Sequence, residues 1–164
     1  MYKILEDTIE YLLTSRTFRY SVELGVGTGK IGAVLKRHTN YLVGVDQDKL
    51  RLQMAAEQSF YDELIISDLG TFNIPSQCDS IFLFDVIEHL PLDEGAILLR
   101  KFLNMNFIML STPSEFFYFA HNNHESLWNL DSLSMFGFNK FWLVEEPTSF
   151  LYGKKILAIK NSSD

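Results

Sequence analysis

The sequence predicts an α/β fold with a doubly wound, mostly parallel sheet. Two observations carry this prediction. Residues 22–35 read as a strand, a glycine turn and a helix, and short apolar strands then alternate with helices as far as residue 111. The chain has 164 residues, of which 47% are hydrophobic, so it can bury the core of a single domain. We therefore expect one domain over residues 1–164.

The glycine turn is the most informative segment, and residues 22–32 read VELGVGTGKIG. Gly25, Gly27 and Gly29 stand at alternate positions, where glycine allows positive φ and the close approach of a ligand to the main chain. The helix that follows presents unpaired N–H groups to the same place. Lys30 occupies the position where a dinucleotide-binding turn has its third glycine. We therefore expect a polar or anionic ligand here, and the dinucleotide pattern fits poorly.

The other elements follow from the spacing of apolar residues. Residues 79–84 form a nearly continuous apolar run, as in a central parallel strand that is buried on both faces. An amphipathic helix is expected at residues 4–12, with Ile4, Leu5, Thr8, Ile9 and Leu12 on its buried face. We expect further strands at 41–45, 63–67 and 106–111, helices at 30–37, 49–58, 91–103 and 130–136, and a closing hairpin with strands at 138–146 and 154–160.

Composition narrows the class of protein. The net charge of −7 gives no global basic field for nucleic acid, and Cys78, the single cysteine, permits no internal disulfide. The first residues carry acids among their apolar positions, unlike a signal peptide, and no apolar run reaches the length of a membrane span. We expect a soluble cytoplasmic protein that does not act in a membrane.

Two acids follow predicted strands. Asp46 ends the strand at 41–45, about 20 residues after the first glycine, where an acid of a doubly wound fold accepts hydrogen bonds from ribose hydroxyls. Asp68 ends the strand at 63–67 in the same manner. The alternative is that both are turn or helix-capping residues, with Asp48 as the cap of the next helix.

Four segments together resemble the class I S-adenosylmethionine-dependent methyltransferases. They are E-L-G-x-G-x-G from Glu23, V-G-V-D-Q-D ending at Asp48, D-V-I-E-H-L-P from Asp85, and S-T-P at residues 111–113. The resemblance covers nearly the whole chain. It implies a Rossmann-like, three-layer α/β/α fold whose seven-stranded sheet has an antiparallel last strand. It also implies S-adenosyl-L-methionine as the cofactor. The parts are then an N-terminal helix (1–18), a cofactor-binding half (19–111) and an acceptor-side loop with the closing hairpin (112–164).

The resemblance also implies residue roles. The glycine turn lies under the methionine part of the cofactor, with Glu23 near its amino group, and Asp46 binds the ribose. The remaining cofactor-binding residues implied in this way are Gln47, Asp68, Leu69 and Asp85.

On the acceptor side, the candidate catalytic residues are Glu88, His89 and His124. A histidine here would remove a proton from the acceptor, because imidazole exchanges protons near neutral pH. The alternative is that Glu88 and His89 only hydrogen-bond the loop. Residues 115–128 are rich in aromatic side chains and would line an acceptor pocket, dock a partner subunit or second copy, or pack over the sheet.

A small-molecule O-, N- or C-acceptor is the favoured substrate, a protein acceptor is also open, and two further alternatives remain. Small-RNA 3′-terminal 2′-O-methyltransferases carry a similar E-x-x-E-H segment and a later histidine, which bind a divalent ion. Carried over, the metal ligands would be Asp85, Glu88, His89 and His124, with Asp85 replacing a glutamate of that family. The other alternative is a non-catalytic domain that binds the cofactor or a partner.

Overall fold

Helices and strands alternate along the described part of the chain, as the sequence predicts. The structure, a computed structural model, describes residues 3–114, 124–147 and 152–161, and it divides into two compact units, Tyr2–Phe82 and Leu83–Asp164. The elements of the first unit are α1 (Lys3–Leu13), β1 (Phe18–Leu24), α2 (Gly32–His38), β2 (Thr39–Asp46), α3 (Lys49–Glu57), β3 (Glu63–Ile66) and the first residues of β4 (Ser80–Phe84).

The second unit begins within β4. It continues with a 3₁₀ turn, η1 (Ile87–His89), α4 (Leu92–Lys101), β5 (Phe107–Pro113), α6 (Leu130–Ser134), β6 (Lys140–Pro147) and β7 (Tyr152–Asn161). The predicted aromatic segment 115–128 is described only from residue 124 onward, so most of it lies outside the described residues.

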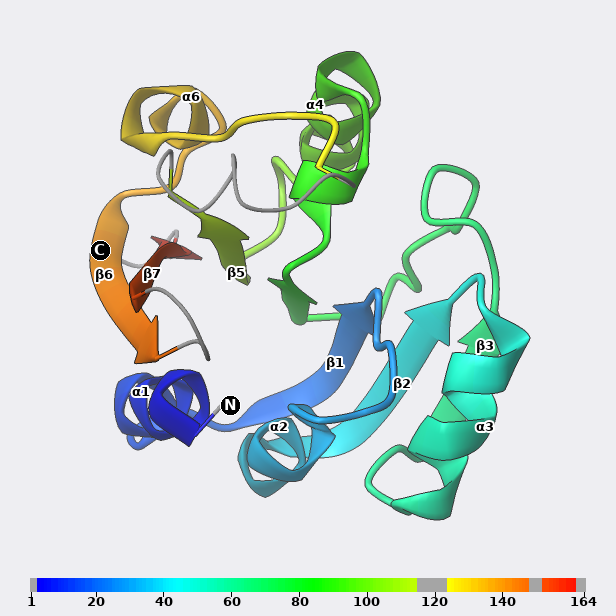
Figure 1. The fold of residues 1–164 in the computed structure, drawn as a ribbon. Coiled ribbons are helices and arrows are strands. Elements are labelled where there is room, and N and C mark those ends of the chain that lie inside the picture. Colours follow the sequence, from blue (N-terminus) through cyan, green and yellow to red (C-terminus); the bar gives the residue numbers. More distant parts are fainter. Residues whose placement is uncertain (1–2, 115–123, 148–151, 162–164) are drawn as a thin grey trace. The chain divides into compact units, whose positions relative to one another are not determined.

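The strands pair in the order β3-β2-β1-β4-β5-β7-β6 (Figure 1). In the first unit β1 pairs with β2, and β2 with β3, in parallel, so each connection needs a crossover helix. In the second unit β7 is antiparallel to both β5 and β6. The predicted fold class, a mostly parallel doubly wound sheet with an antiparallel C-terminal hairpin, is confirmed.

Apolar faces explain how the helices of the first unit pack. α2 contacts β2, and α3 contacts β2 and β3, while α1 contacts α2 (Figure 1). In α1 the fully buried residues are Leu5, Ile9 and Leu13, which recur at the four-residue spacing of one helix face. The predicted face placed Ile4 inside, but Ile4 is 44% exposed. The buried face of α1 is therefore centred one residue further along the chain than the predicted face.

Two other boundaries differ from the prediction. The first strand begins at Phe18, four residues before the apolar segment from which it was predicted. The helix after the glycine turn begins at Gly32, because Lys30 and Ile31 still belong to the turn. Among the described residues, the helices are all too short or too polar to cross a membrane.

Candidate functional site

The glycine turn follows β1 directly and adopts the conformation that its spacing predicts. Gly25, Gly27 and Gly29 have φ values of 74°, 57° and 80°, which favour glycine over residues with a Cβ. The main-chain N–H of Gly25 donates to the carbonyl oxygen of Val45 in β2 at 2.8 Å. A Cβ built on Gly27 would meet no described atom within 4 Å. The turn is thus tied to β2 at its start and faces open space at Gly27.

Asp46, the last residue of β2, connects the strand end to this turn. Its Oδ2 accepts a hydrogen bond from the Gly27 N–H at 2.7 Å, and its Oδ1 accepts one from the Asp48 N–H at 2.9 Å. Each carboxylate oxygen has a further lone pair, so Asp46 can still accept hydrogen bonds from ligand hydroxyls. Asp48 is the N-cap of α3, as predicted, since its carboxylate accepts from the N–H groups of Leu50 and Arg51.

The other predicted cofactor residues of this unit lie near strand ends. Gln47 follows Asp46 and is exposed. Asp68 stands two residues after β3, is exposed, and accepts a hydrogen bond from the Thr71 N–H at 3.1 Å, while Leu69 beside it is half-buried. This hydrogen bond supports the alternative that Asp68 is a turn residue. The predicted role of Asp68 in binding adenine stays a prediction.

Glu23, in β1, is buried, and its carboxylate accepts a hydrogen bond from a specific donor. Only 2% of the residue is exposed, and the Tyr61 hydroxyl donates to its Oε2 at 2.8 Å. Burial raises the pKa of Glu23 to about 8; the hydrogen bond from Tyr61 acts in the opposite direction, and the negative charge of Asp46 raises the pKa further. Glu23 is thus held below the turn by a partner that the sequence analysis did not identify.

Tyr61 was missed because it belongs to no motif, but two glycines give a signal for it. Gly32 opens a helix and Gly44 lies inside β2, where glycine often marks the close approach of another group. At Gly32 that group is the Tyr61 ring, 2.7 Å from a built Cβ. At Gly44 the ring lies 2.9 Å from a built Cβ, and the side chains of Val26 and Leu64 lie 2.7 Å from it.

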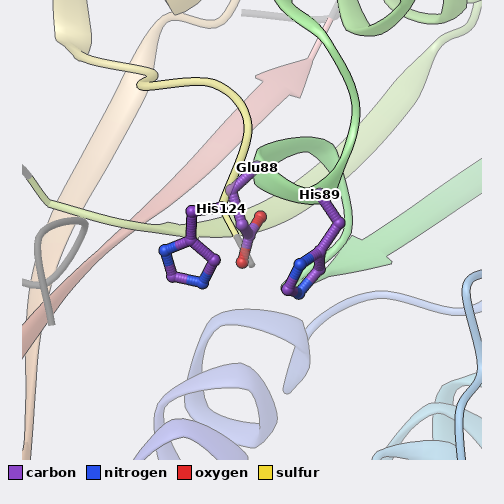
Figure 2. Close-up of side chains that lie close together, drawn as sticks. All are labelled: Glu88, His89 and His124. Atoms are coloured by element: carbon purple, nitrogen blue, oxygen red, sulfur yellow. The ribbon is translucent and has the colours of Figure 1, made fainter. Parts of the chain in front are cut away.

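In the second unit, Glu88, His89 and His124 form one group (Figure 2). One possible ligand atom from each residue lies within 4.8 Å of the others, and the imidazole centroids of His89 and His124 are 5.1 Å apart. Glu88 is 1% exposed, His124 is half-buried and His89 is exposed. Neither carboxylate oxygen of Glu88 has a hydrogen-bond partner among the described residues. The structure thus brings together all three predicted catalytic residues.

Hydrogen bonds hold the segment that carries His124 against the turn that carries Glu88. The N–H groups of Glu125 and Ser126 donate to the Glu88 carbonyl oxygen at 2.8 and 3.2 Å. The Ser126 hydroxyl donates to the Ile87 carbonyl oxygen at 3.0 Å, and the indole N–H of Trp128 donates to the Ser126 Oγ at 2.8 Å. Trp128 is 1% exposed and lies so close to Gly95 of α4 that a Cβ there would be 2.7 Å from its ring. Trp128 therefore anchors the position of His124.

Trp128→Phe is expected to lower the free energy of unfolding by about 2 kcal/mol, because a buried indole N–H and ring volume are lost. Urea denaturation measures this change. Trp142→Phe is the control. Because Trp142 lies in β6 and is only half-buried, this variant should lose less free energy of unfolding than Trp128→Phe does. Equal losses in the two variants would contradict the anchoring role of Trp128.

The charges around Glu88 come from two neighbours. Burial raises the pKa of Glu88 well above its usual range, and the negative charge of Asp85 raises it further, while the positive charge of Lys155 acts in the opposite direction. A carboxyl group that is buried in this way takes up a proton more readily than one in water. It also gains stability from a cation that binds beside it.

Asp85 lies outside the Glu88–His89–His124 group and has its own partners. It has a φ of 56°, which is uncommon for a residue with a Cβ. Its Oδ1 accepts from the Ser111 hydroxyl at 2.9 Å, and its Oδ2 accepts from the ammonium of Lys155, a residue only 5% exposed. Protein groups thus occupy both oxygens. The predicted roles of Asp85 toward cofactor or metal stay predictions, and the sequence analysis did not identify Lys155.

Comparison with known proteins supports the same family as the motifs. Residues 22–105, more than half of the chain, match a family model described as a methyltransferase domain. No curated protein matches the chain.

Among solved structures, magnesium protoporphyrin IX methyltransferase (ChlM) from Synechocystis PCC 6803 with bound SAM is 14% identical, with a TM-score of 0.72 over 96% of this chain and 78% of that one. N-methyltransferase NodS from Bradyrhizobium japonicum WM9 is 13% identical, with a TM-score of 0.78 over 94% of this chain and 92% of that one. The methyltransferase domain of a bacterial Hen1 (CtHen1-CN) is 17% identical, with a TM-score of 0.71 over 96% and 97%. The TM-scores show a shared fold. The match to the family model shows that the chain belongs to the methyltransferase-domain family, and it is a class I S-adenosylmethionine-dependent methyltransferase.

Proposed function

We propose that this methyltransferase transfers a methyl group to an oxygen, nitrogen or carbon atom of a small-molecule acceptor. The observation that carries the proposal is the convergence of His124 with Glu88 and His89, the two residues that lie in the turn after the strand β4. In open α/β sheets, ligands bind beyond the carboxyl ends of the strands, so this group is expected to face the acceptor.

The residues of the first unit fit S-adenosyl-L-methionine. Gly27 has open space where a Cβ would lie, and Asp46 keeps lone pairs for ribose hydroxyls beside it. In the proposed arrangement the turn with Gly25 and Gly29 lies under the methionine part, Glu23 lies toward the amino group, and Gln47, Asp68 and Leu69 line the adenine. When bound, the cofactor supplies an electrophilic methyl carbon on a sulfonium.

The protein's part in the reaction is orientation and proton removal. Aligning the nucleophile with the methyl carbon accounts for most of the rate enhancement expected in such a transfer. His89 is exposed and lies within 4.8 Å of the Glu88 carboxylate, so it can take a proton from the acceptor while Glu88 stabilises the imidazolium that forms. His124 is proposed to orient the acceptor from the opposite side.

A metal-assisted RNA 2′-O-methyltransferase is the second candidate. Glu88, His89 and His124 offer carboxylate and imidazole ligands that suit a divalent ion such as Mn²⁺, and the buried oxygens of Glu88 have no described hydrogen-bond partner. These three residues, without Asp85, are the ligands that the geometry favours. A bound ion would lower the pKa of an acceptor hydroxyl.

The test uses S-adenosylmethionine labelled in its methyl group, with a panel of small hydroxyl, amine and carbon acceptors and, separately, a small RNA with a free 3′ end. Each reaction is run with EDTA and with Mn²⁺. Label in a small molecule in the presence of EDTA supports the first proposal. Label only in the RNA, and only with Mn²⁺, would overturn it and establish the second candidate.

His89→Gln is expected to lower the rate of methyl transfer about 100-fold while leaving cofactor affinity unchanged, because it removes a proton acceptor without touching the glycine turn. Single-turnover transfer and calorimetric titration measure the two quantities separately. An unchanged transfer rate would contradict the role of His89 as a base.

A further inference from the structure

Tyr61 lies between α3 and β3, outside every segment that the family resemblance covers in detail. Its ring packs with Val26 of the glycine turn and with Leu52 and Ala55 of α3. These neighbours make Tyr61 part of a small apolar cluster directly behind the turn. Its hydroxyl, however, points to a carboxylate rather than to solvent.

The ring of Tyr61 fits a space that three glycines leave open. A Cβ built on Gly32 would lie 2.7 Å from the ring, one on Gly44 would lie 2.9 Å from it, and one on Gly29 would lie 3.3 Å from it. Real Cβ atoms do not approach other atoms to less than about 3 Å without displacement. Gly32 therefore makes room for this ring, and Gly44 and Gly29 make room for the apolar cluster that contains it.

The hydroxyl of Tyr61 connects the apolar cluster to a buried carboxylate. It donates a hydrogen bond to Glu23 Oε2 at 2.8 Å, and Glu23 is buried near the end of β1. A phenol that donates one hydrogen bond fixes the rotamer of the carboxylate and leaves Oε1 available to another donor. The negative charge of Asp46 also acts on Glu23, and it raises the pKa of the Glu23 carboxyl.

We propose that Tyr61 is a positioning residue of the methyl-donor site: its hydroxyl orients Glu23 toward the amino group of the cofactor, and its ring supports the glycine turn. This inference rests on the proposed binding of the cofactor by Glu23 and the turn. The ligand chemistry is that of an α-amino group, which a buried carboxylate binds by a charge-assisted hydrogen bond.

Tyr61→Phe removes the hydroxyl and keeps the ring, so the fold is retained. We expect the affinity for S-adenosylhomocysteine at pH 7.5 to fall about tenfold, because the orientation and the ionisation of Glu23 both depend on this hydrogen bond. The variant should also shift the pH profile. The Tyr61 hydrogen bond lowers the pKa of Glu23, so without it the carboxylate forms, and binding strengthens, only at a higher pH than in the wild type.

Tyr41→Phe is the matched control, because Tyr41 stacks on Tyr20 with ring centroids 5.0 Å apart and is 37% exposed. Calorimetric titration of S-adenosylhomocysteine between pH 6 and 9 distinguishes the outcomes. Weaker binding with a shifted profile for Tyr61→Phe, and unchanged binding for Tyr41→Phe, supports the inference. Wild-type affinity and profile in Tyr61→Phe would overturn it. A wild-type protein that does not bind the ligand would instead overturn the proposed function.

Discussion

Asp46→Asn is expected to weaken the binding of S-adenosylmethionine about 100-fold or more. The carboxylate is proposed to accept hydrogen bonds from the ribose hydroxyls, while it already accepts one from the Gly27 N–H at 2.7 Å. An asparagine has the same shape but keeps only one oxygen and carries no charge. It would lose a charge-assisted hydrogen bond to the ligand and would also loosen the turn at Gly27.

Asp48→Asn is the control for this prediction. It is the same substitution two residues away, and asparagine caps a helix about as well as aspartate, so α3 should keep its N-cap. Calorimetric titration of the cofactor into each folded variant measures the effect. Equal losses of affinity in the two variants, or none in either, would contradict the proposed role of Asp46.

Glu88→Gln is expected to abolish most methyl transfer and to stabilise the protein. Transfer should fall about 100-fold, because the carboxylate that supports His89 is lost. The free energy of unfolding at pH 8 should rise by about 1 to 3 kcal/mol, because a carboxylate whose charge is disfavoured by burial and by the negative charge of Asp85 is replaced by a neutral amide. Gains in stability at the expense of activity are common at functional sites.

The pH dependence of this stabilisation has a definite sign. The folded protein raises the pKa of Glu88, so it binds the proton more tightly than the unfolded chain does. The stability that protonated Glu88 contributes is present at low pH. It is lost as the pH rises from the usual glutamate range through the raised pKa. The advantage of Glu88→Gln over the wild type should therefore grow with pH over that range.

Urea denaturation in EDTA from pH 5 to 9 measures this difference. Glu94→Gln is the matched control, because Glu94 lies exposed in the first turn of α4. Its stability should follow the wild type at every pH. A Glu88→Gln variant that is less stable than the wild type at pH 8 would show that the carboxylate has a stabilising partner, and would contradict the account of Glu88 as a group poised for a ligand.

The fold was predictable because its main signals are local. The three glycines between β1 and α2, the continuous apolar run of β4 and the spacing in α1 each depend on neighbouring residues alone. Boundaries were less accurate. β1 extends back to Phe18 through Arg19, which is exposed, and Tyr20, which is half-buried, and burial there depends on packing partners that the local sequence does not specify.

The same distinction applies to the candidate sites. Glu88 and His89 lie in one motif, and His124 was identified as the later histidine that the resemblance to the small-RNA 2′-O-methyltransferases implies. Tyr61 and Lys155 were missed, because their partners, Glu23 and Asp85, lie 38 and 70 residues away in the chain. Contacts between such distant positions have no local pattern. Gly32, at the start of a helix, and Gly44, inside a strand, were the local signals of the contact with Tyr61.

Titration of S-adenosylmethionine into the purified wild-type chain tests the central claim most directly, with EDTA in one series and Mg²⁺ or Mn²⁺ in another. We expect one binding site per chain in both series, because the glycine turn and Asp46 are proposed to bind the cofactor without a metal. No heat of binding in any series, from folded protein that carries no copurified ligand, would contradict the account of this chain as a methyltransferase.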